Sequence, residues 1–128
     1  MDVSAPSMKR VVDHIHALGM DAELHSCGKV EELVPCVVEI GFQMHECQDI
    51  MDFDVVVPAY GDKILFHVPQ ETSAYDSPEG EQVAAARAFG DKLLAWGNSV
   101  ILGDYYAPNP VNNIFQDELY RYLRQKMA

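Results

Sequence analysis

The spacing of hydrophobic positions changes along the chain, from helical periods to short apolar runs and back. Near the start, apolar side chains recur three and four residues apart and stop at a glycine, which predicts a helix over residues 6–18. The same patterns predict strands over 20–26, 42–47, 63–68 and 99–103, helices over 29–40, 78–96 and about 109–126, and an irregular or helical connection over 49–60. One leading helix therefore precedes four strand–helix units.

This alternation indicates a parallel sheet, because parallel strands need a crossover and the crossover is usually a helix. The third and fourth strands carry the continuous apolar runs Ile64-Leu65-Phe66 and Val100-Ile101-Leu102, which are typical of strands covered on both faces. The fold class is therefore α/β. A (β/α)8 barrel would need eight such units, about twice what this chain supplies.

Composition narrows the class of protein. A chain of 128 residues that is 48% hydrophobic can bury one core, so we expect a single domain over residues 1–128. A formal charge of −11 disfavours nucleic acid and anionic membrane surfaces as partners. We expect no membrane span and no secretory signal, hence a cytoplasmic protein whose three cysteines are thiols or metal ligands.

Two predicted strands end in a His-x-Cys triplet, His25-Ser26-Cys27 and His45-Glu46-Cys47. Residues i and i+2 of a strand point to one face, so each histidine can converge with its cysteine, and these are ligands that zinc favours. His67 and Asp104 also fall at predicted strand ends and suit metal binding or acid/base chemistry. If the strands are parallel, all six side chains surround one cavity. The alternative without function is that they are ordinary strand residues.

Five segments carry a family likeness. They are Leu24-His25-Ser26-Cys27-Gly28, Val38-Glu39-Ile40-Gly41, Gln48, Tyr60-Gly61-Asp62-Lys63-Ile64 and Pro110-Val111-Asn112-Asn113-Ile114. Through them, residues 21–128 resemble the C-terminal half of the uroporphyrinogen decarboxylase (URO-D) superfamily, and the His-Ser-Cys-Gly segment is closest to its cobalamin-dependent methyltransferase branch. The resemblance implies a parallel four-stranded (βα)4 half of a TIM-type (β/α)8 barrel with a leading helix.

In that branch, a His-x-Cys pair and a later cysteine hold a zinc ion that activates a thiol for methyl transfer from a corrinoid. Carried over, His25 and Cys27 are the first two ligands, and Asp104 stands near the position of the later cysteine. Asp104 or His67 would complete the shell or act as a catalytic group. The resemblance gives His45 and Cys47 no support, so they are the weaker candidates. Gln48, Tyr105 and Tyr106 are candidates for binding substrate.

The resemblance also implies that the first half of the barrel is missing. We therefore expect a homodimer or a complementary chain that carries the N-terminal half, with a corrinoid protein as a further partner. Two alternatives stay open. One is a metal-free decarboxylase of porphyrin metabolism, and the other is a catalytically incomplete barrel fragment that serves as a partner subunit.

Overall fold

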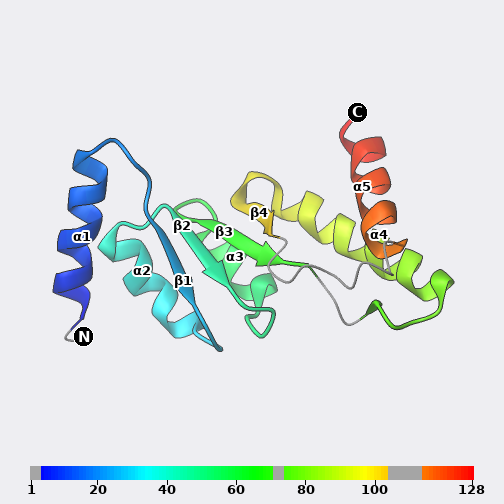
Figure 1. Ribbon diagram of the computed structural model, residues 1–128, viewed down its shortest axis with the longest axis horizontal. Helices are drawn as coiled ribbons and strands as arrows, with labels where there is room; N and C mark the ends of the chain where they lie inside the picture. Colours follow the sequence, from blue (N-terminus) through cyan, green and yellow to red (C-terminus); the bar gives the residue numbers. More distant parts are fainter. Residues whose placement is uncertain (1–3, 71–73, 104–113) are drawn as a thin grey trace. The chain divides into compact units, whose positions relative to one another are not determined.

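The computed structural model describes residues 4–70, 74–103 and 114–128, which group into two compact units. The first unit comprises the described residues up to 69 together with 98–103, and the second comprises those of 70–97 and 104–128. Strands and helices alternate along the chain in the order that the sequence predicts (Figure 1). In chain order the elements are α1 (Ala5–Ala17), β1 (Glu23–Ser26), η1 (Glu31–Leu33), α2 (Val34–Ile40), β2 (Met44–Cys47), α3 (Phe53–Tyr60), β3 (Leu65–Pro69), α4 (Glu79–Trp96), η3 (Gly97–Ser99), β4 (Val100–Gly103) and α5 (Ile114–Met127).

The four strands of the first unit form one parallel sheet in the order β1-β2-β3-β4. The α/β prediction with a parallel four-stranded sheet is therefore confirmed. Each strand pairs with the next along the chain, and right-handed crossovers in this order place successive connecting helices on the same face of a sheet. The sheet is wound in one direction only, which differs from the two-way winding of a doubly wound fold.

The two faces of this sheet differ in burial. One face carries buried side chains, among them His45, Phe66 and Val68, which join the core with Val34, Val37 and Ile40 of α2 and Val56 and Val57 of α3. On the other face, the alternate residues of β3 are only half-buried, and Ile101 of β4, which pairs with His67, is exposed. The expectation that the third and fourth strands are covered on both faces is therefore wrong. We call the less buried side the open face of the sheet.

The helix predicted over residues 29–40 is shorter in the structure. A 3-10 turn, η1, occupies residues 31–33, and α2 begins only at Val34, with Pro35 in its first turn. Proline lacks an N–H group and clashes with the preceding turn, so it is tolerated at the start of a helix and not within one. At the other end Gly41 adopts the left-handed conformation, with φ of 101°, and ends α2 as predicted.

The second unit contains α4 and α5, which pack against each other. The rings of Phe89 and Phe115 lie with centroids 6.3 Å apart, and Arg87 Nε donates to the buried Glu118 carboxylate at 2.7 Å. Gly90 faces the ring of Tyr122 so closely that a Cβ there would lie 2.8 Å from its Cδ1 atom. In the part of the chain that the structure describes, no helix is long and apolar enough to cross a membrane.

Candidate functional site

The register of the sheet decides which candidate side chains meet. His25 pairs with Glu46, Glu46 with His67, and His67 with Ile101, so these four residues form one row across the sheet. His45 instead pairs with Leu24 and Phe66, one position out of this row. Because successive residues of a strand point to opposite faces, His25 and His67 lie on the open face and His45 on the buried one.

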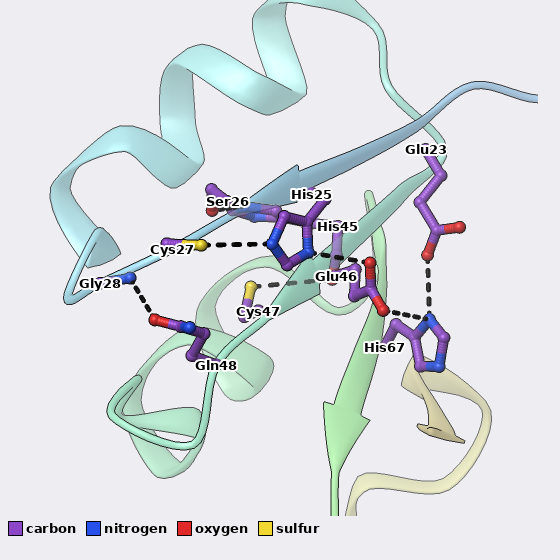
Figure 2. Close-up of polar contacts among 10 residues, drawn as sticks. All are labelled: Glu23, His25, Ser26, Cys27, Gly28, His45, Glu46, Cys47, Gln48 and His67. Carbon is purple, nitrogen blue, oxygen red and sulfur yellow. Dashed lines mark hydrogen bonds and ion pairs between the residues drawn. The ribbon is translucent and has the colours of Figure 1, made fainter. Parts of the chain in front are cut away.

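On the open face, His25, Glu46 and His67 form a continuous series of polar contacts. Cys27 and Glu23 extend this series at its two ends. His25 Nε2 lies 3.3 Å from Cys27 Sγ, and His25 Nδ1 lies 2.9 Å from Glu46 Oε2. The other oxygen of Glu46, Oε1, is 3.9 Å from His67 Nδ1, which is 3.0 Å from Glu23 Oε1. Figure 2 shows that Cys27 and Glu23 lie at the two ends of this series, with Glu46 between the two imidazoles. We call these five residues the polar row.

The carboxylates of the polar row determine the orientation of the histidines. An ionised carboxylate only accepts hydrogen bonds, so the nitrogen that faces it carries the proton. His25 therefore donates from Nδ1 to Glu46 and presents Nε2 to the thiol of Cys27. His67 donates from Nδ1 to Glu23 in the same way.

Cys27 directly follows β1 in a tight turn. Gly28 adopts a φ of 90°, a conformation that favours glycine, and its N–H donates to Gln48 Oε1 at 2.7 Å (Figure 2). Gln48, a predicted substrate-binding residue, thus ties the turn after β1 to the turn after β2. Its amide oxygen helps to hold the exposed Cys27 thiol beside His25.

His67 lies over a glycine on the neighbouring strand. Gly103 is the last residue of β4, and a Cβ atom at this position would overlap the His67 imidazole at Nε2 and Cδ2. The ring can occupy this place only because Gly103 has no side chain.

The second His-x-Cys pair belongs to the core. His45 is 0% exposed and its Nε2 lies 2.7 Å from Ser26 Oγ; burial, and then the charge of His25, lower its pKa. Burial, together with the charges of Glu31 and Glu46, raises the pKa of Cys47 to about 12. At neutral pH Cys47 is therefore a protonated thiol, whereas a metal binds the thiolate, and its burial suits a core residue.

The structure brings together three of the six residues expected around one cavity, namely His25, Cys27 and His67, and places His45 and Cys47 on the opposite face. Asp104, Tyr105 and Tyr106 lie outside the described residues. Within the described ranges, no group of three or more His, Cys, Asp and Glu residues is placed to hold a metal ion.

Sequence reasoning missed Glu23 and Glu46. The alternation of side chains along β2 places Glu46 on the face opposite to His45 and Cys47, but its meeting with His25 depends on the register of the strands. For Glu23, the sequence did contain a usable signal. Glu23 lies two residues before His25 in the same strand, which places both side chains on one face of β1.

Comparisons with protein-family models, with curated proteins and with solved structures found no match to this chain. The URO-D resemblance therefore stays a prediction, and the geometry of the polar row carries the functional argument.

Proposed function

We propose that this chain is one half of a TIM-type barrel of the URO-D superfamily and that His25 and Cys27 are two ligands of a zinc centre. The zinc would serve methyl transfer from a corrinoid protein to a thiol. The observation that carries this proposal is the approach of His25 Nε2 to Cys27 Sγ at 3.3 Å on the open face of the sheet.

This separation suits two ligands of one metal ion. With Zn–N of about 2.0–2.1 Å and Zn–S of about 2.3 Å, a tetrahedral zinc site holds its nitrogen and sulfur ligands about 3.5 Å apart. The measured 3.3 Å is close to this value. Glu46 adds a second feature of zinc sites, because a histidine ligand commonly donates its other N–H to a carboxylate, which fixes the tautomer and orients the ring.

Each residue of such a site would have a separate role. His25 and Cys27 bind, Glu46 holds the His25 tautomer, and Gln48 holds the turn after Cys27. A bound zinc would stabilise the thiolate form of the acceptor at neutral pH, the form that attacks a methyl group. We propose Asp104 as the third ligand, since a catalytic zinc takes about three protein ligands and keeps one open position.

The winding of the sheet supports the half-barrel. The parallel order β1-β2-β3-β4, with one buried face and one open face, is that of successive strands in a barrel whose interior is the open face. Active sites of such barrels lie beyond the carboxyl ends of the strands, which is where Cys27 follows β1. The barrel would be completed by a second copy or by a chain with the other half.

Metal analysis of protein purified without chelator tests the proposal. We expect zinc in the wild type and its loss in His25→Ala and Cys27→Ser, whereas Glu46→Gln should weaken zinc binding by about 10- to 100-fold. The controls are His14→Ala, an exposed histidine of α1, and Cys36→Ser, a half-buried cysteine of α2, which should keep the metal. A wild type without zinc, under conditions in which it is folded, would remove the mechanism.

A further inference from the structure

We infer that the outer side of α5 is a docking surface for an acidic amphipathic helix of another protein chain. The surface consists of Tyr120, Leu123 and Met127 together with Arg121 and Arg124, and we call it the α5 stripe. The inference goes beyond the proposed zinc centre, because none of these residues lies in the unit that contains the sheet.

α5 has apolar side chains on two sides, and α4 covers only one of them. On the inner side, Phe115 and Leu119 are buried against α4. On the outer side, Tyr120, Leu123 and Met127 follow one another at spacings of three and four residues, which places them in one line along the helix. Tyr120 is 64% exposed and Met127 is 75% exposed. Apolar side chains on two sides are typical of a helix that packs between two neighbours.

The exposed side of α5 is positively charged, although the chain as a whole is acidic. Residues 114–128 carry three of the 9 Lys and Arg side chains against two carboxylates, a formal charge of +1, whereas the whole chain carries −11. One of these carboxylates, Glu118, is buried and binds Arg87 Nε at 2.7 Å and Arg121 Nη1 at 3.3 Å. The exposed side chains of α5 therefore present an excess of positive charge to a partner.

The guanidinium of Arg124 lies within the α5 stripe. Its Cζ atom is 5.7 Å from the centroid of the Tyr120 ring, and its Nη1 donates to Tyr120 Oη at 3.2 Å. These contacts hold the cation beside the apolar side chains. Tyr120 and Arg124 line two shallow hollows, of which one extends to Arg121 and the other to Leu123. A partner can therefore place an apolar side chain in a hollow and a carboxylate on Arg124 at the same time.

These features fit an acidic helix better than a nucleic acid or a membrane. A helix laid along α5 packs its own apolar stripe on the α5 stripe, and its flanking carboxylates pair with Arg121 and Arg124. Nucleic acid binding needs more cations, and the charge of −11 repels both phosphate backbones and anionic lipids. From Tyr120 to Met127 the stripe spans about 10 Å of helix, so we expect weak, reversible binding.

Fluorescence anisotropy with a designed peptide tests the inference on the full chain. The probe is a labelled helical peptide of about three heptads with leucine at a and d and glutamate at the flanking positions, and its counterpart has lysine in place of glutamate. We expect the acidic peptide to bind in the micromolar range and to lose affinity as salt rises, and the basic peptide not to bind. No binding of the acidic peptide, or equal binding of both peptides, would overturn the inference.

Charge reversal locates the contact on the protein. Arg124→Glu should weaken binding by about tenfold or more, because it places like charges opposite each other, and Arg124→Gln should weaken it less. Arg10→Glu makes the same change at an exposed arginine of α1 and should bind the peptide as the wild type does. Circular dichroism checks that each variant is folded. Equal affinities for Arg124→Glu and Arg10→Glu would place the contact elsewhere and contradict the inference.

Two further measurements identify the class of partner and the surface. We expect no binding to vesicles of equal parts phosphatidylcholine and phosphatidylglycerol, and vesicle binding tighter than peptide binding would assign the surface to a membrane and refute the inference. In ¹H–¹⁵N spectra of the full chain, the acidic peptide should shift the amide signals of residues 120–127 and leave those of α1 unchanged. Shifts confined to other elements would also refute it.

Discussion

At the scale of single residues, two triplets of the same type have opposite chemistry because the sheet presents them to different surroundings. Cys27 is exposed and lies 3.3 Å from His25 Nε2, whereas Cys47 is 4% exposed with a pKa of about 12. The difference arises from position relative to the strand register and not from the residue types, so only the first pair is available to a ligand.

Thiol labelling should separate the three cysteines. After chelator treatment at about pH 8, we expect maleimide to modify the exposed Cys27 first, the half-buried Cys36 more slowly, and Cys47 only on unfolding. A rise in pKa from 9.0 to about 12 lowers the thiolate fraction of Cys47 by about a thousandfold, in addition to the loss of access. Mass spectrometry of labelled peptides gives the three rates, and the fastest phase should vanish in Cys27→Ser. Equal rates for Cys27 and Cys47 in the folded protein would contradict this order.

His45 should make the stability of the protein depend on pH. Burial lowers its pKa in the folded state, so between that value and the unfolded value of about 6.5 the unfolded chain binds more protons. The free energy of unfolding should therefore fall as pH falls through about 6.5 and level off below the folded pKa. Urea midpoints across this range should show the loss in the wild type and in the exposed-histidine control His14→Gln, and a smaller loss in His45→Gln. An unchanged slope in His45→Gln would assign the effect to other groups.

At the scale of elements, hydrophobic periodicity predicted the order of helices and strands, but not how the strands are aligned. The similarity of the two His-x-Cys triplets would suggest that His25 pairs with His45 across the sheet. In the structure, His25 of β1 instead pairs with Glu46 of β2. A slip of one residue moves every side chain to the other face, and the choice depends on how α2 packs Val34, Val37 and Ile40 into the core. Such long-range packing is not encoded in the local pattern, so the polar row could not be predicted from spacing alone.

Close packing at the end of α3 gives a test of the fold. Gly61 has an ordinary φ of −65°, but a Cβ there would lie 2.6 Å from both Ser99 Cβ and the Val57 carbonyl oxygen. Gly61→Ala should therefore lower the free energy of unfolding by about 1–3 kcal/mol through overpacking. Gly80→Ala in the first turn of α4 meets no atom within 4 Å and should be neutral or slightly stabilising. Denaturant unfolding measures both, and a neutral Gly61→Ala would show that the end of α3 and Ser99 of η3 are not in close contact.

At the scale of the whole molecule, the open face of the sheet is the surface best suited to association with another chain. It carries the polar row and the exposed Ile101, and β1 and β4 are the outer strands of the sheet. Exposed apolar side chains and outer strands both favour association with another chain. The family resemblance predicts the same association, because it implies a half-barrel, and the single-direction winding of the sheet is compatible with that prediction.

The last prediction is that two copies associate through the open face. Ile101 is 43% exposed on this face in β4, and a stable interface needs about 1,200–2,000 Å² of buried surface, enough to cover much of one side of such a sheet. Light scattering should report a dimer for the wild type and a shift toward monomer in Ile101→Lys, because burying an unpaired charge opposes association. Leu18→Lys replaces a 60% exposed leucine at the C-cap of α1 and should leave the dimer intact. A wild type that stays monomeric at high concentration would exclude the homodimer.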